Sequence, residues 1–205
     1  MRQPVMPEAL FFDRRPADQK HRQTLGAAGP PECAVVLQSA GRFQQPAGLG
    51  RADLLLEQLL FGPVEKVYCV NARRAAPLVD DTTNVMMTHK NGAISNLLCT
   101  LSSAVHYRIA VYGSRGLAET EKLSFDTLRI IPAPDKPPSG AHQTAEPQII
   151  ENKGFNQVKA ALEAFAGAVR GKAPFPITPD QILHGVAVFE AIEKSAKSGK
   201  PAKVG

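Results

Sequence analysis

The stretch that decides the fold runs from Thr82 to Leu101 and reads TTNVMMTHK, then NG, then AISNLLCTL. Asn91-Gly92 between two extended runs is the strongest short signal for a β-hairpin, because such turn residues must adopt positive φ. Further strands are predicted at residues 64–72, 106–112, 117–119 and 126–131 from their β-branched and aromatic content. Short turns join them, so the sequence predicts an antiparallel meander.

Helical patterns flank this meander. Residues 51–61 carry leucines at helical spacing, and Gly62-Pro63 ends that helix. A second helix has a single apolar stripe, formed by Phe155, Val158, Leu162, Phe165 and Val169. A third begins at a capping box, Thr178 to Gln181, and its predicted buried stripe is Ile182, Val186, Phe189 and Ile192. The predicted class is α+β, a mostly antiparallel sheet with helices on one face.

The N-terminal residues 1–47 differ from the rest of the chain. They contain six prolines, and their hydrophobic residues show no helical or alternating periodicity over most of the segment. A short apolar run at 34–37 suits a strand. We therefore expect a loosely ordered arm over 1–47 and an α+β domain over 48–205. Residues 132–148 contain five prolines and are predicted to form an exposed loop.

Composition excludes several classes of protein. The 205 residues are 43% hydrophobic and 21% charged, which is typical of a globular chain and not of a disordered one. Three scattered cysteines exclude a disulfide scaffold and favour a reducing, cytoplasmic compartment. No apolar run is long enough for a membrane helix. The net charge of +5 is spread along the chain, so we expect no nucleic-acid partner.

Motifs for catalysis, cofactor binding or metal binding are missing from the sequence. It contains neither a G-x-G-x-x-G nor a G-x-x-x-x-G-K-[ST] phosphate loop. None of the five histidines has a partner at metal-ligand spacing. His89, beside the predicted turn, is expected to be exposed, whereas His184 is expected to be packed or hydrogen-bonded on its helix. Asp80-Asp81 is read as a turn former rather than as a metal or acid–base pair.

One polar pair remains as a candidate binding site. His106 and Arg108 share one face of a predicted strand, and such a pair can contact an anionic or polyhydroxyl ligand. The same pair also suits an exposed sheet face or a subunit interface.

From about Gly48 to Val204 the chain resembles the C-terminal domain of the Gfo/Idh/MocA family of NAD(P)-dependent oxidoreductases. The resemblance rests on an ordered set of stretches: residues 59–67 (LLFGPVEKV), Asp81-Thr82-Thr83 before the hairpin, 111–119 (VYGSRGLAE), 176–180 (PITPD), 188–192 (VFEAI) and 195–200 (SAKSGK). It implies an open-faced sheet used in subunit contacts, hence a homo-oligomer, and NAD or NADP as the family's cofactor.

The departures from that family are as informative as the match. The Rossmann domain and Glu-Lys-Pro motif that precede this domain in the family are not found in these 205 residues. In an ungapped alignment from Gly48 to Gly62, Ala52 stands where the family has its catalytic His, and Gly48 where it often has Asp. Asp53 is one residue out of place and is kept as a substrate-binding candidate beside His106 and Arg108.

These features leave three hypotheses, and they leave open whether the chain is an enzyme. The first is a truncated or degenerate sugar or cyclitol oxidoreductase that is not catalytic alone. The second is a non-catalytic oligomerisation or substrate-binding module that acts with a full-length paralogue. The third is an enzyme that completes its cofactor site with another chain.

Overall fold

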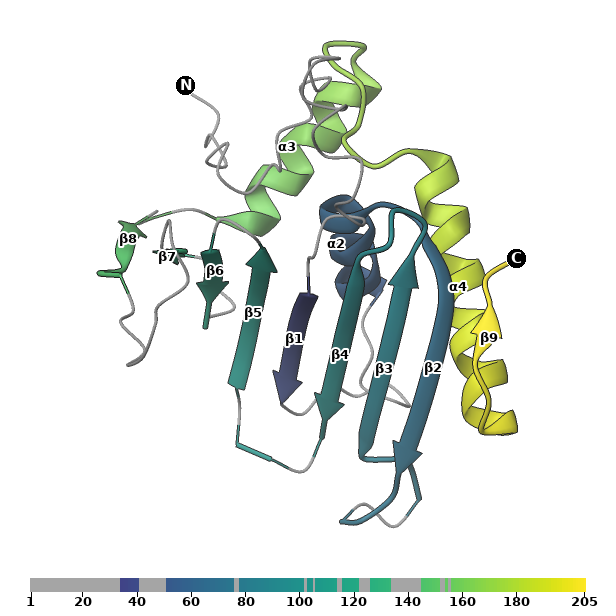
Figure 1. Cartoon of the computed structure of the whole chain (residues 1–205). Coiled ribbons are helices and arrows are strands. Elements are labelled where there is room, and N and C mark those ends of the chain that lie inside the picture. Colours follow the sequence, from purple (N-terminus) through teal and green to yellow (C-terminus); the bar gives the residue numbers. More distant parts are fainter. Residues whose placement is uncertain are drawn as a thin grey trace, which may run out of the picture.

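The computed structural model describes residues 34–40, 51–75, 78–101, 103–104, 106–113, 116–121, 126–133, 145–151, 154 and 156–205. They form a nine-stranded sheet with helices beside it (Figure 1). The helices are α2 (Arg51–Phe61), α3 (Gln157–Val169) and α4 (Pro179–Ser198). The strands are β1 (Ala34–Ala40), β2 (Val64–Ala72), β3 (Thr82–His89), β4 (Ile94–Thr100), β5 (His106–Gly113), β6 (Gly116–Thr120), β7 (Thr127–Pro132), β8 (Gln148–Glu151) and β9 (Ala202–Lys203).

The strand order is β8-β7-β6-β5-β1-β4-β3-β2-β9, and every neighbouring pair is antiparallel except β1 with β4. The α+β class is thereby confirmed. The predicted meander is interrupted: β2 to β4 are consecutive neighbours, as are β5 to β8, but β1 lies between β4 and β5 and pairs in parallel with β4. The hairpin of β3 and β4 closes over three residues, not two, because His89 N donates to Ala93 O. Gly92 takes the positive φ of 88° that the turn requires.

The strand predicted within residues 34–37 belongs to the sheet. Strand β1 was expected as a short run within an outlying arm, but it lies in the middle of the sheet, between β5 and β4 (Figure 1). Its seven residues pair along their whole length with both neighbours. The partners of a central strand come from distant parts of the chain and cannot be read from local sequence. The rest of 1–47 lies outside the described residues.

The hydrophobic core lies between the sheet and helices α2 and α4. Alternate strand residues such as Val85, Met87 and Leu97 point into it, and Leu54, Phe61 and Val188 meet them from the helices. In α4 the prediction was partly wrong. Ile182 and Val186 are 50% and 45% exposed, and the buried residues are Gly185, Val188, Ala191, Ile192 and Ser195. Small side chains such as Gly185, Ala191 and Ser195 allow α4 to lie close to β2. The size of the side chains, as well as their hydrophobicity, therefore decides which face of α4 is buried.

The ends of α4 follow the predicted chemistry. Thr178 Oγ1 accepts from Gln181 N, and the Gln181 side chain accepts from Thr178 N, which completes the capping box. Gly199 ends the helix in the left-handed region with φ 64°. None of the described helices is long and apolar enough to cross a membrane.

Candidate functional site

A buried polar cluster joins α2 to the hairpin of β3 and β4. His89 was expected to be exposed, but it is only 1% exposed. Alternate residues of β3 point to the same side, so His89 faces the core together with Val85 and Met87. Its Nδ1 lies 2.9 Å from Gly62 O and its Nε2 lies 2.9 Å from Ser95 Oγ. A carbonyl only accepts, so the hydrogen-bond pattern assigns the proton to Nδ1 and leaves Nε2 to accept from the Ser95 hydroxyl.

The side chains of this cluster are buried and have little contact with solvent. The fully buried Glu57 places Oε2 at 3.8 Å from His89 Nε2. Burial lowers the pKa of His89, and the nearby His184 acts in the same direction, while the hydrogen bond to Gly62 opposes them. Burial and then Lys90 lower the pKa of His184, whose Nε2 accepts from Val64 N at 3.0 Å. Both imidazoles serve the fold, as predicted for His184.

The opposite face of the sheet carries a second polar cluster. Glu119 on β6 is 3% exposed, and its two oxygens accept from Arg108 on β5 at 2.6 Å and from Arg129 on β7 at 2.7 Å. Burial pushes the pKa of Glu119 up, but the hydrogen bonds from the two arginines outweigh it and hold the pKa below its usual value. Bonding to Glu119 likewise raises the pKa of Arg108. The three groups carry one net positive charge.

The same face exposes apolar side chains from several strands. Met86 is 47% exposed and Ile94 51% exposed, while their chain neighbours Met87 and Ser95 are buried on the helix side. Val70 on β2 and Tyr112 on β5 are also exposed. His106 lies on this face, two residues from Arg108, so the structure brings these two candidates together. We refer to this surface as the open sheet face.

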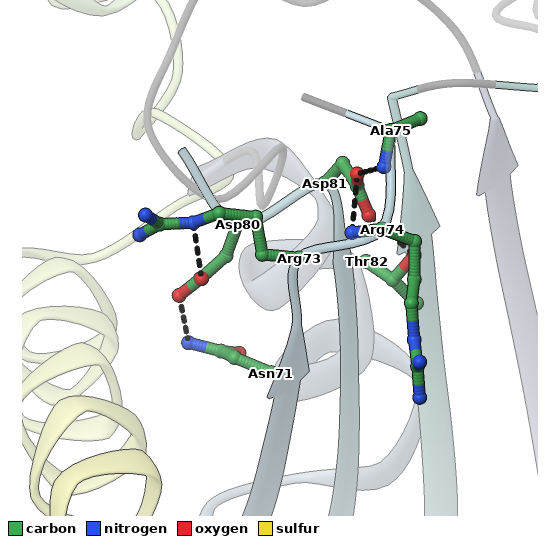
Figure 2. A network of polar contacts seen from close by, with 7 residues as sticks. All are labelled: Asn71, Arg73, Arg74, Ala75, Asp80, Asp81 and Thr82. Atoms are coloured by element: carbon green, nitrogen blue, oxygen red, sulfur yellow. Dashed lines mark hydrogen bonds and ion pairs between the residues drawn. The ribbon is translucent and has the colours of Figure 1, made fainter. Parts of the chain in front are cut away.

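Asp80 and Asp81, just before β3, make hydrogen bonds and an ion pair to residues at the end of β2 and in the β2–β3 connection (Figure 2). Asp81 is 2% exposed, and its Oδ2 accepts from the backbone N–H groups of Arg74 and Ala75. Asp80 accepts from the Asn71 side chain at 3.2 Å and pairs with Arg73 at 3.6 Å. Each carboxylate therefore has backbone or side-chain partners within the β2–β3 connection, in keeping with the reading of a turn former. Among the described residues no cluster of His, Cys, Asp and Glu forms that could hold a metal ion.

Two helix starts are capped by side chains of the chain itself. Asn156 accepts from Lys159 N at the start of α3, and Thr178 accepts from Gln181 N at the start of α4. Ala52 and Asp53 lie in the first turn of α2, and the description does not extend to their side chains.

Glu57, Ser95, Glu119 and Arg129 were not singled out from the sequence. Only Glu119 had a usable signal. In the β5–β6 hairpin, Gly113 pairs with Gly116 and Ala110 with Glu119, which puts Glu119 on the face of Arg108, one diagonal away. The contact of Ser95 with His89 depends on the register of the β3–β4 hairpin, and those of Glu57 and Arg129 depend on how α2 and β7 pack against these strands.

The fold is an α+β domain with an open, mostly antiparallel sheet. Residues 53–119 match the family model described as GFO/IDH/MocA C-terminal domain, which confirms the resemblance read from the sequence. No curated protein matches the chain.

Solved structures share the fold over most of the chain. UDP-N-acetylglucosamine 3-dehydrogenase GnnA from Acidithiobacillus ferrooxidans has 17% identity and a TM-score of 0.67, over 87% of this chain and 58% of that one. Aldose-aldose oxidoreductase from Caulobacter crescentus has 20% identity and a TM-score of 0.66, over 89% and 58%. WlbA dehydrogenase from Bordetella pertussis, in complex with NADH and UDP-GlcNAcA, has 15% identity and a TM-score of 0.62, over 91% and 60%. The chain thus spans about three fifths of the length of these relatives.

Proposed function

We propose that this chain is a degenerate member of the NAD(P)-dependent sugar or cyclitol oxidoreductases that does not transfer hydride by itself. Hydride transfer needs a held nicotinamide and a group that accepts the hydroxyl proton. Ala52 stands at the position of the family's histidine. Of the described histidines, His89 and His184 are hydrogen-bonded within the fold, and His106 lies on the open sheet face. These observations support a domain without its own proton acceptor.

We further propose that the chain works as an association module through the open sheet face, either with a second copy or with a full-length paralogue. The observation that carries this proposal is the set of exposed apolar side chains there: Val70, Met86, Ile94 and Tyr112. At about 4.8 Å between strands and about 3.3 Å per residue, β2, β3, β4, β1 and β5 make a face of roughly 600 Å². With β6 and β7 it approaches the roughly 800 Å² per partner of a standard interface.

The open sheet face also holds the proposed ligand contacts. Arg108 and Arg129 both donate to Glu119, and Glu121 also acts electrostatically on Arg108, which lies beside His106. Guanidinium N–H groups favour a carboxylate or phosphate of a substrate or partner. Asp53 remains a proposed substrate contact on α2.

Two measurements test the proposal. NADH and NADPH titrations followed by calorimetry should show no binding up to millimolar cofactor, and micromolar affinity would contradict the non-catalytic assignment. Light scattering should give a multiple of 22.0 kDa for the wild-type chain. The double variant Met86→Glu/Ile94→Glu should reduce that mass, because charge on the open sheet face opposes its burial. Leu78→Glu, at a position 84% exposed in the β2–β3 connection, is the matched control and should leave the mass unchanged.

A further inference from the structure

Two backbone amides of β2 donate to side chains of α4, the helix that runs alongside that strand (Figure 1). Val64 N donates to His184 Nε2 at 3.0 Å, and Cys69 N donates to Ser195 Oγ at 2.9 Å. An imidazole changes its charge between pH 5 and 8, whereas a serine hydroxyl does not. Of these two contacts, the one made by His184 is therefore the one that can respond to pH.

The two contacts hold halves of α4 that are attached to different degrees. Every residue of α4 is described, and within 179–187 the one buried residue is Gly185, which contributes no side chain to the core. The second half buries Val188, Ala191, Ile192 and Ser195. The first half therefore depends more on its hydrogen bond to β2, because it gains little from apolar burial.

The partner of His184 fixes the protonation state of its ring. A backbone N–H only donates, so Nε2 must offer its lone pair to Val64 N and the single ring proton is on Nδ1. A second proton, on Nε2, would face the N–H of Val64 at 3.0 Å, and this hydrogen bond would be lost. His184 is half-buried, so water can deliver that proton.

His89 responds differently to a proton. Its Nδ1 already donates to Gly62 O, and its Nε2 faces the Ser95 hydroxyl, which can rotate and accept instead of donating. A protonated His89 therefore keeps both hydrogen bonds, with Glu57 Oε2 at 3.8 Å. Of these two imidazoles, His184 is the one that loses a contact when it is protonated.

The charges near His184 disfavour its protonated form. Burial, and then the positive charge of Lys90, lower the pKa of His184, so the neutral ring is the folded form at pH 7. The elements that meet near His184 carry these titratable and charged groups: Glu57 on α2, Glu65 on β2, His89 and Lys90 in the β3–β4 hairpin, and Asp180 on α4 itself.

We propose that protonation of His184 releases the start of β2 and the first half of α4, residues 179–187, while the second half of α4 stays attached to the sheet. This places a pH-sensitive joint directly after Gly62-Pro63, where α2 ends and β2 begins. The joint operates whether or not the open sheet face is paired, so its test is independent of the proposed function.

Amide hydrogen exchange followed by NMR tests the release, with each rate divided by the intrinsic rate at the same pH. Below about pH 6.5, protection of the Val64 amide should fall by about tenfold per pH unit, until His184 is protonated in the folded chain as well. At pH 5.5 the exchange of Val64 should hardly change with urea, because a local opening exposes little surface. Exchange of the Cys69 amide, held by Ser195, should be slower and should accelerate with urea. Equal rates and equal urea dependence at the two amides overturn the proposal.

Two matched variants identify the group that senses pH. His184→Gln keeps an acceptor for Val64 N but cannot be protonated, so the pH dependence of the Val64 amide should disappear. His106→Gln makes the same change at an exposed histidine on the open sheet face and should keep the wild-type pH dependence. A His184→Gln variant with the wild-type pH dependence overturns the proposal.

The wild-type chain gives a test that needs no variant. At pH 8 the ¹⁵N chemical shifts of the His184 ring should place its proton on Nδ1. A proton on Nε2 would contradict the hydrogen bond from Val64 and overturns the proposal.

Discussion

Replacing Glu119 with Gln removes the carboxylate that joins Arg108 to Arg129 while keeping the size of the side chain. Glu119 is 3% exposed, and its carboxylate accepts three hydrogen bonds from the two arginines. In the variant, an amide group directs N–H donors toward guanidinium donors, so part of this network is lost. The expected result is a less stable domain with an unchanged fold.

The magnitude follows from burial. Breaking a fully buried ion pair costs about 3–5 kcal/mol, whereas exposed pairs contribute about 1 kcal/mol or less. Here the carboxylate is buried, but the arginine side chains are 30% and 46% exposed, so solvent screens them in part. We expect Glu119→Gln to lower the free energy of unfolding by about 2 kcal/mol at pH 7, which corresponds to a decrease in Tm of about 4–8 °C.

Urea unfolding followed by circular dichroism measures this loss. Glu193→Gln is the matched control, since Glu193 pairs with Lys197 in solvent, and we expect a change within about 0.5 kcal/mol. The folded pKa of Glu119 is depressed, so its contribution is complete above the unfolded pKa of about 4.3 and is lost as the pH falls through the folded pKa. A Glu119→Gln variant as stable as wild type at pH 7 would refute this reasoning.

Three further predictions concern the fold. The pKa values of His89 and His184 are lowered in the folded state, so the unfolded chain binds protons more readily. The free energy of unfolding of the wild type should therefore fall as the pH drops below about 6.5. His89→Gln should make this pH dependence shallower in urea melts at pH 5 to 8. Ser195→Ala removes a hydroxyl that accepts from Cys69 N and donates to Lys200 O, and should cost about 1–3 kcal/mol in urea unfolding. Gly116 has φ 135°, and an added Cβ would lie 2.1 Å from Ile131 O. Gly116→Ala should therefore lower the free energy of unfolding by about 3 kcal/mol or more in thermal melts. A Gly116→Ala variant as stable as wild type would contradict this close approach.

Local patterns predicted most of the elements. Asn91-Gly92 located the central hairpin, and Gly62-Pro63 and the Thr178 capping box located helix ends, because each signal acts within a few residues. The placement of β1 was beyond local sequence. Its pairing with β4 and β5 joins residues more than 50 positions apart.

The polar clusters were harder to predict than the elements. His89 was read as exposed because it precedes a turn, yet the two-residue period of β3 continues through it and directs it inward. Arg108 was identified on the correct strand face, but its carboxylate partner comes from the next strand. A cluster built from several strands is defined by register, and register depends on turn geometry and packing as well as on composition.

Oxidation of two adjacent methionines is the most direct test of the proposed open-face interface. Met86 lies on the open sheet face and is 47% exposed, while Met87 is fully buried on the helix side and serves as an internal control. With dilute peroxide and peptide mapping by mass spectrometry, Met86 should be protected at high protein concentration and should become reactive on dilution, while Met87 stays unmodified throughout. Oxidation of Met86 at one rate across all concentrations, equal to its rate in an Ile94→Glu variant, would contradict the assignment of the open sheet face as an interface.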